Sequence, residues 1–210
     1  MGTSSAVNCV SIVLLLVASY AMAPRLPQWT GWENGPVENL QVLMLCAGGL
    51  LAIRYGRAEP TQQRRTFWSL LAPIWFILAA RELSWGACFL TPYATAPDTG
   101  PKFSSSVQLA HRTGILGAVA LLVAVLLWRF VRSGQLRFLA SLYREKRVPF
   151  AEIGCIVLCL LASGAAEGHL QVDLGLGPVW VAQTFEELAE TGAYAALLLA
   201  QWRVFASRTT

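Results

Sequence analysis

Charged residues are scarce in this chain. Only 13% of its 210 residues are Asp, Glu, Lys or Arg, and 55% are hydrophobic, whereas a soluble domain averages about 25% charged residues. No polar stretch is long enough to form a separate soluble domain, and the apolar runs exceed the roughly ten-residue segments of an outer-membrane barrel. The composition therefore predicts a single helical membrane domain covering residues 1–210.

Metal-binding and redox motifs are also lacking. None of the five cysteines belongs to a CxxC pair, and four of them lie inside apolar runs, where a free thiol behaves as a small hydrophobe. The chain has two histidines and no HExxH sequence. These absences argue against a cysteine-rich zinc site and against an intramembrane zinc hydrolase that uses three histidines.

Six apolar runs approach or exceed the length that a helix needs to cross a bilayer, about 20 residues. They predict an all-α bundle of six transmembrane helices, at residues 6–23, 37–55, 66–90, 113–131, 148–168 and 179–205. The first run ends in Ala21-Met22-Ala23, which is similar to a signal-peptidase site, but Pro24 directly after it argues against cleavage. Cleavage and retention leave the remaining topology the same.

The basic residues predict the orientation, because Lys and Arg concentrate on the cytoplasmic side of membrane proteins. With six spans, twelve of the sixteen basic residues fall on one side: Arg54, Arg57, Arg64, Arg65, Arg129, Arg132, Arg137, Arg144, Lys146, Arg147, Arg203 and Arg208. Three fall on the other side (Arg25, Lys102 and Arg112), and Arg81 lies within a span. Both termini are therefore expected in the cytoplasm. This topology explains how the net charge of +4 is distributed, so the charge predicts no nucleic-acid partner.

The basic segment 132–147 interleaves leucines and a phenylalanine with Arg and Lys. One interpretation is a short helix lying on the anionic inner surface of the membrane. The other is a plain basic loop. Both interpretations place the segment on the cytoplasmic side.

Acidic residues gather on the opposite side. Nine of the twelve fall in the outer half of the membrane or outside it: Glu33, Glu38, Glu82, Asp98, Glu167, Asp173, Glu186, Glu187 and Glu190. An ionisable group near the centre of a span costs roughly 2.5–3.5 kcal/mol on insertion scales, and a rise of 1.5 Å per residue puts Glu190 deepest. Glu186 and Glu190 share a helix face, which Gln183 extends. We therefore expect a polar cavity that opens to the outside, with Glu190 at its floor.

Arg81 is the basic residue that this topology places inside a span. Since a buried charge needs a partner and Arg can hold a carboxylate with two parallel hydrogen bonds, we expect Arg81 to pair with an acid from another helix. Two alternatives remain open. The deep acids could form a structural ion network, and Glu38 and Glu167, near the surface, could extend to water.

Several short stretches resemble a family of bacterial multi-pass membrane proteins. They are residues 32–38, residues 81–86, Gln108 with His111, and residues 186–190. Members of that family have an Asp-Gly-x-x-Glu stretch before the second span, a Glu-Glu-x-Ser-Trp-Gly stretch in a later span and a Glu-Glu pair near the end. This chain departs from the pattern at Asn34, which replaces Asp, and at Arg81, which replaces the first Glu. The resemblance implies a protein of the bacterial inner membrane and points to residues without naming a reaction.

The first functional hypothesis is a membrane enzyme or binding protein for a lipid or cell-envelope molecule, acting at the outer side. Its catalytic candidates are Glu82, Glu186, Glu187, Glu190 and Arg81, and its ligand-binding candidates are Glu33, Glu38, Trp85 and Gln183. A divalent metal held with the help of His111, His169 and Glu167 would supply a nucleophilic water, with Glu187 as general base. The alternative for both histidines is a place in a loop or at the rim. Without a metal, Glu82 could act as a general acid if burial keeps it protonated.

Two other classes of function remain open. Proton- or ion-coupled transport fits the buried glutamates, which are natural proton carriers, although no inverted repeat relates the two halves of the chain. The third hypothesis is an accessory subunit or a homo-oligomer that meets a membrane-protein partner. Gly192 and Ala196, spaced as a small-xxx-small pair, would suit helix packing within or between chains.

Overall fold

The computed structural model describes residues 3–207, so Arg208 lies outside the described part of the chain. Almost all regular structure is helical. The helices are α1 (Thr3–Met22), α2 (Pro36–Ala58), α3 (Gln62–Glu82), α4 (Ser105–Gln108), α5 (Arg112–Arg132), α6 (Gln135–Arg144), α7 (Phe150–Ala166) and α8 (Val179–Ala206), with 3-10 turns at Ala23–Arg25, Gln28–Gly31 and Ser84–Phe89. The strands β1 (Ala94–Ala96) and β2 (Gly100–Lys102) form an antiparallel hairpin in which Thr95 faces Pro101.

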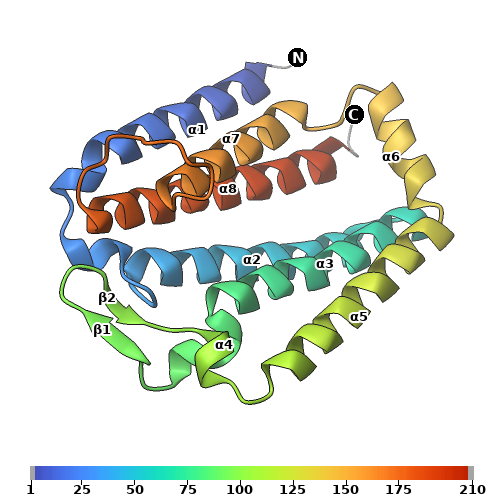
Figure 1. Cartoon of the computed structure of the whole chain (residues 1–210). Coiled ribbons are helices and arrows are strands. Elements are labelled where there is room, and N and C mark those ends of the chain that lie inside the picture. The colour runs from blue at the N-terminus through green and yellow to red at the C-terminus, as the bar shows by residue number, and fades with distance from the viewer. Residues whose placement is uncertain (1–2, 208–210) are drawn as a thin grey trace.

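The long helices lie side by side in two groups (Figure 1). α1, α7 and α8 pack on one another, α2 and α3 form a second pair, and α8 joins the two groups by packing on α2. The β1–β2 hairpin and α4 lie at one end of the bundle, which we call the hairpin end. α6 lies at the other, which we call the α6 end, and the start of α1 and the end of α8 both lie toward it (Figure 1).

α8 is the central helix of the bundle. It contributes residues to each of the three buried apolar clusters, among them Tyr194, Ala193 and Phe185. Small residues allow its neighbours to approach closely: a Cβ at Gly192 would lie 3.2 Å from the Cys159 thiol of α7. The predicted small-residue pair on this helix therefore packs within the chain.

A hydrogen-bonded bridge joins α2, α3 and α8 in the interior. The Trp75 indole N–H donates to Gln201 Oε1 at 2.5 Å, and Gln201 Nε2 donates to the Gly48 carbonyl at 2.9 Å. Trp75 is 1% exposed and Gln201 is 5% exposed. A buried polar group is costly unless it is hydrogen-bonded. The bridge gives the side-chain amide of Gln201 one donor and one acceptor partner in an otherwise apolar layer.

Two buried acids lie toward the α6 end, and basic side chains accompany each. Glu152 of α7, which is fully buried, accepts from Arg203 Nη1 of α8 at 2.9 and 3.0 Å. Glu59, 1% exposed, accepts from the Trp68 indole at 3.3 Å and lies 3.7 Å from Arg64 Nη1. Both acids are therefore held by partners from the chain itself.

The segment 132–147 forms a helix, α6, for most of its length. Its apolar side chains Phe138 and Leu142 are buried in the largest apolar cluster, and the Phe138 ring lies 5.1 Å from that of Phe67 in α3. The loop interpretation is therefore wrong for residues 135–144. The apolar face of α6 packs, at least in part, on the protein itself.

The third apolar run ends earlier than its composition predicts. α3 stops at Glu82, and the chain turns sharply because Ser84, Trp85 and Gly86 have φ angles of 46°, 58° and 95°. Left-handed backbone is uncommon for residues with a side chain. In the sequence, Gly86 is therefore the one residue of the three that indicates a turn. Arg81 and Glu82 therefore lie in the last turn of a helix and not in the middle of a span.

Within the described residues, three helical segments are long and apolar enough to cross a membrane: Val7–Arg25, Gln28–Ala58 and Arg112–Arg132. α7 is apolar but has only 17 residues. α3 and α8 are longer, but Gln, Arg and Glu side chains lower their hydropathy. The expected helical architecture is confirmed, and three of its described segments have the length and hydropathy of membrane-spanning helices.

A methyl group added at Gly48 should weaken the interior bridge. In Gly48→Ala the new Cβ would overlap the Trp75 indole, whose N–H is held by Gln201. Overpacking of this kind costs about 1–3 kcal/mol. We expect that loss in the free energy of unfolding, measured by denaturation of the detergent-solubilised protein.

The matched control for this prediction is Gly117→Ala in α5, where an added Cβ meets nothing within 4 Å. Alanine favours a helix over glycine by about 1 kcal/mol, so this variant should be as stable as the wild type or more so. Equal stability of the two variants would contradict the packing that we describe around Gly48.

Candidate functional site

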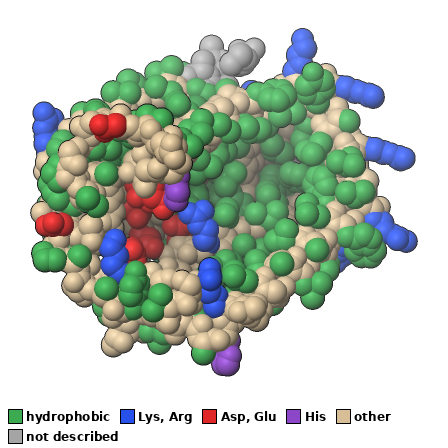
Figure 2. Space-filling model, viewed as in Figure 1, with side chains coloured by type: hydrophobic (Ala, Val, Ile, Leu, Met, Phe, Trp, Pro, Cys, Tyr) green, Lys and Arg blue, Asp and Glu red, His purple; other side chains and the backbone are tan. Residues whose placement is uncertain are grey.

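Acidic side chains converge at the hairpin end of the bundle. Figure 2 shows them set back in a hollow of this face, with basic and histidine side chains near its edge. The Glu187 carboxyl lies within electrostatic reach of four others, and Glu186 is coupled to two more. Together they make up what we call the carboxylate site: Glu33, Glu38, Glu82, Glu167, Glu186, Glu187 and Glu190.

Arg81 lies between acids of two helices. Its Nη2 is 3.5 Å from Glu190 Oε1 of α8, and its Nε is 3.6 Å from Glu82 Oε1, its neighbour in α3. The expected pairing of Arg81 with an acid from another helix is therefore present. The Arg81 side chain is still 55% exposed, because the end of α3 holds it at the mouth of the hollow. Glu190 also accepts a hydrogen bond from Ser163 of α7 at 3.3 Å.

Glu82 is the most enclosed carboxylate of the site, at 7% exposed. The Tyr194 hydroxyl donates to its Oε1 at 2.7 Å from the opposite helix, α8. Sequence analysis missed Tyr194, although it lies four residues after Glu190 and so shares its helix face. The pair joins α3 to α8 below the charged residues.

Glu187 meets a second residue that sequence analysis missed, Gln41 of α2. Gln41 is fully buried, and its Nε2 donates to the Glu187 carboxylate at 3.0 Å, to the Glu187 carbonyl at 2.7 Å and to the Thr191 hydroxyl at 3.2 Å. The sequence could have indicated Gln41, because it lies three residues after Glu38 and so on the same face of α2. Gln41 Oε1 is buried and has no hydrogen-bond partner among the described residues.

Glu38 closes the turn that begins α2. Its Oε2 accepts from the backbone N–H of Asn34, which has a left-handed φ of 56°. Asn39 Nδ2 donates to the carbonyls of Asn34 and Gly35 at 2.9 and 2.8 Å. An acidic residue near a helix N-terminus also interacts favourably with the helix dipole. Glu38 therefore has a structural role in addition to its place at the site.

Glu33 ties the hairpin to the start of α2. Its Oε2 accepts from the Phe103 N–H at 2.5 Å, and its Oε1 lies 3.4 Å from Lys102 Nζ at the end of β2. Close packing supports these contacts, because Gly100 of the hairpin lies against the Trp32 ring with no room for a Cβ. The hairpin thus covers one side of the carboxylate site.

Glu186 differs from its neighbours because it is unpaired. Within the described part of the chain its carboxylate makes no hydrogen bond and no close ion pair, and Lys102 is a cation that acts on it electrostatically. The side chain is only partly exposed. It is therefore the acid of the site most available to a ligand.

Two of the ligand-binding candidates from the sequence make no polar contact within residues 3–207. Gln183 is partly buried on α8, one turn before Glu186 and Glu187. Trp85 lines a different cavity, between α2, α3 and α5, because the turn after α3 directs it there. The sequence placed Trp85 with Glu82, but the backbone reversal separates their side chains.

The histidines do not join the acids in a metal site. His169 Nδ1 lies 2.7 Å from Glu167 Oε2, and both side chains are largely exposed. His111 directly precedes α5, and the two histidines lie apart on the face shown in Figure 2. Among the described residues no group of three or more His, Cys, Asp or Glu side chains could hold a metal ion. The metal hypothesis therefore gains no ligand set from the structure.

The chemical capacity of the site follows from its unequal charges. It brings seven carboxyls together, whereas the fixed cations among its described neighbours are Arg81 and Lys102. A group of carboxylates with so few cations favours any species that adds positive charge, either protons or a cationic ligand. Such a site could bind an amine or transfer a proton.

The hairpin should depend on the contact between Gly100 and Trp32. Gly100→Ala would crowd the indole and also strain a backbone whose φ is 73°. We expect the hairpin to leave Glu33, so that trypsin cleaves after Lys102 about tenfold faster or more, as a cost of 1–3 kcal/mol implies.

Gly177→Ala isolates the contribution of crowding. Gly177 has a φ of 75°, and a Cβ there meets nothing within 4 Å, so the backbone strain is matched without the contact to Trp32. Cleavage after Lys102 should stay at the wild-type rate. If both variants accelerate it equally, Trp32 does not anchor the hairpin.

Comparisons with protein-family models, with curated proteins and with solved structures find no match for this chain. The resemblance of its motifs to a bacterial membrane-protein family therefore stays a prediction.

Proposed function

We propose that the chain crosses a bacterial inner membrane six times, with both termini in the cytoplasm and the carboxylate site in the periplasmic half. Three observations support this topology. The three helical segments that are long and apolar enough to cross a membrane belong to a bundle that also contains α3, α7 and α8. The start of α1 and the end of α8 both lie toward the α6 end (Figure 1). Among residues 3–207, eleven of the fifteen basic residues fall on the side that contains α6, as the positive-inside rule requires of the cytoplasmic side.

We propose further that the carboxylate site binds the cationic group of a lipid or a cell-envelope molecule. The observation that carries this proposal is Glu186, a partly enclosed carboxylate without a hydrogen bond or close ion pair in the described part of the chain. A cationic ligand would pair with Glu186 and reduce the repulsion among the other acids. The surrounding bilayer would supply an apolar environment for the rest of an amphiphilic ligand.

Catalysis by acid–base chemistry is compatible with the same geometry. Glu82 has a hydroxyl donor, Tyr194, at 2.7 Å and a guanidinium, Arg81, at 3.6 Å. A bound ligand could exchange a proton with this group if it reached hydrogen-bond distance. Binding comes first, because Glu186 is partly exposed and the Arg81 side chain is 55% exposed, whereas Glu82 is only 7% exposed.

The geometry favours a site open on one side over a transport path. Along α8, the polar residue after Tyr194 that faces the interior is Gln201, about 10 Å further at 1.5 Å per residue. Leu197 and Leu198, which lie between them, pack against the largest apolar cluster. A proton or ion leaving Glu190 toward the α6 end would have to cross this apolar layer.

The topology is tested by thiol labelling in intact cells. After replacement of the five native cysteines, Asp98→Cys in the hairpin loop should react with a thiol reagent that cannot cross the inner membrane. Arg144→Cys at the end of α6 should react only after the cells are lysed. The reverse pattern, or equal labelling of both, would overturn the proposed orientation.

The ligand proposal is tested with a matched pair of amphiphiles, dodecylamine and N-acetyldodecylamine, of which only the first carries a positive charge. Binding to the purified protein is measured by native mass spectrometry. We expect the amine to bind at least tenfold more tightly than its acetylated form, because a charged hydrogen bond is worth roughly 1.5–3 kcal/mol. Glu186→Gln should remove most of this difference.

Asp98→Asn is the control for formal charge. Asp98 is exposed in the hairpin loop, away from the contacts of the carboxylate site, so its neutralisation should leave the preference for the amine intact. A protein that binds the two amphiphiles equally, or that loses its preference equally in both variants, does not use Glu186 as we propose.

A further inference from the structure

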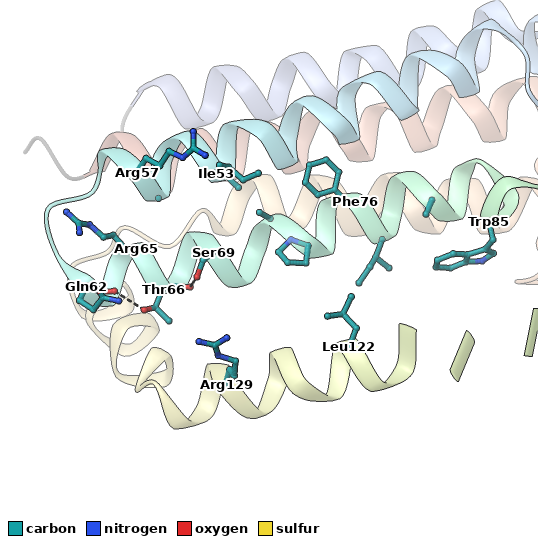
Figure 3. A pocket seen from close by; sticks show the side chains of 16 residues that line it. Ile53, Arg57, Gln62, Arg65, Thr66, Ser69, Phe76, Trp85, Leu122 and Arg129 are labelled. Atoms are coloured by element: carbon teal, nitrogen blue, oxygen red, sulfur yellow. Dashed lines mark hydrogen bonds between the residues drawn. The ribbon is translucent and has the colours of Figure 1, made fainter. Parts of the chain in front are cut away.

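A second cavity lies on the side of the bundle, between α2, α3 and α5 (Figure 3). Its volume is about 1020 Å³. α3 supplies one stripe of lining residues, from Gln62 through Ser69 and Phe76 to Ala80. These positions follow the spacing of a single helix face. The cavity is distinct from the carboxylate site, and Trp85 lies at its far end (Figure 3).

The end of this cavity nearest α6 is basic. Arg57 at the end of α2, Arg65 at the start of α3 and Arg129 near the end of α5 all line it, together with Gln62 and Thr66 at the same end (Figure 3). No Asp or Glu belongs to its described lining. Three cations thus share one end of the cavity without an acid to neutralise them there.

Two of the three guanidinium groups are unpaired. Among the described residues, the side chains of Arg57 and Arg129 make no hydrogen bond or ion pair, and both are exposed. Arg65 uses its Nε to donate to the Glu59 carbonyl at 2.6 Å. That bond does not use the terminal nitrogens of Arg65, for which the described residues supply no acceptor. Guanidinium groups bind phosphate with paired N–H donors.

The remainder of the cavity is apolar and elongated. Ile53, Pro73, Phe76, Ile77 and Leu122 line it. From Gln62 to Ala80 the α3 stripe extends about 27 Å at 1.5 Å per residue, which exceeds the roughly 15 Å of one leaflet's hydrocarbon. A single acyl chain would therefore have room along this wall.

α5 leaves the cavity open to the side. It contacts α3 and α6, but none of its residues is buried, although it is among the segments apolar enough to cross a membrane. Leu122 and Arg129 are two turns apart, so one face of α5 supplies both an apolar and a basic residue. In a bilayer such a crevice is next to lipid and not next to water.

We propose that this cavity binds an anionic phospholipid from the cytoplasmic leaflet, with its phosphate at Arg57, Arg65 and Arg129 and an acyl chain along α3. Basic pockets between transmembrane helices on the cytoplasmic side suit such headgroups. The bound lipid fills the gap between α5 and the rest of the bundle. The inference uses the membrane topology proposed above but is independent of what the carboxylate site binds.

The first test measures binding of phosphatidylglycerol to the detergent-purified protein by native mass spectrometry, with zwitterionic phosphatidylcholine for comparison. In the double variant Arg57→Gln/Arg129→Gln we expect affinity for phosphatidylglycerol to fall at least tenfold, at about 1 kcal/mol for each basic residue. Affinity for phosphatidylcholine should change little.

The control is Arg54→Gln/Arg132→Gln. It removes one exposed arginine from the same end of each of the same two helices, but neither residue lines the cavity. It should bind phosphatidylglycerol as the wild type does. Equal losses in the two double variants would show binding to general surface charge and would overturn the site, as would wild-type affinity in Arg57→Gln/Arg129→Gln.

A second pair of variants tests the proposed path of the acyl chain along the cavity. It also tests the lipid site if the variant Arg57→Gln/Arg129→Gln fails to fold. Leu122→Trp fills the cavity from α5, whereas Leu121→Trp adds the same side chain at a position that does not line it and is 67% exposed. Only Leu122→Trp should weaken phosphatidylglycerol binding at least tenfold. Equal affinities of the two variants would overturn the proposed path of the chain.

Glycerol phosphate distinguishes a lipid from a free phosphate ligand. It has the phosphate but no acyl chain, so at equal concentration it should leave the phosphatidylglycerol bound. Full displacement would overturn the lipid assignment. The Glu186→Gln variant should bind phosphatidylglycerol normally, so that a failure at this cavity is distinguishable from a failure of the proposed carboxylate-site function.

Discussion

The structure depends on how the glutamates of α8 are accommodated inside an apolar bundle. Glu190 is reached by Arg81 from α3 and by Ser163 from α7, and Glu187 is reached by Gln41 from α2. A carboxylate without such partners would be very costly in a low-dielectric interior. Three neighbouring helices therefore each supply a polar group toward α8 at the hairpin end.

The other half of α8 is built differently. Beyond Tyr194 it is rich in alanine and leucine, and Gln201 is its one amide, held between Trp75 and the Gly48 carbonyl. Just before this half, Gly192 has no side chain and lets α7 approach closely. One helix thus combines a polar half that faces the carboxylate site with an apolar half that closes the bundle below it.

The two ends of the bundle carry charges of opposite sign. At the hairpin end, acids outnumber the cations beside them, and Glu186 has no partner in the described part of the chain. At the α6 end, basic residues predominate, and Arg57 and Arg129 line a cavity without an acid in its described lining. In the proposed topology these features would select a cationic ligand on one side of the membrane and an anionic lipid on the other.

By itself the sequence determined the helical architecture, the positions of most helices and the gathering of acids toward one end. These properties follow from hydropathy and from the helical period, which are local. It also indicated that Arg81 needs an acid from another helix, since a buried charge has few alternatives. Among the described residues, length and hydropathy mark three segments as membrane spans. α7 is shorter than these, and polar side chains reduce the hydropathy of α3 and α8.

Only the tertiary structure decided which partners these residues have. The choice of Glu190 for Arg81, the donors Gln41 and Tyr194, and the separation of Trp85 from Glu82 depend on helix rotation and on a left-handed turn after α3. The cavity beside α5 likewise arises because that helix packs on α3 without burying any residue. These features result from contacts between residues far apart in the chain, which hydropathy and helical spacing do not encode.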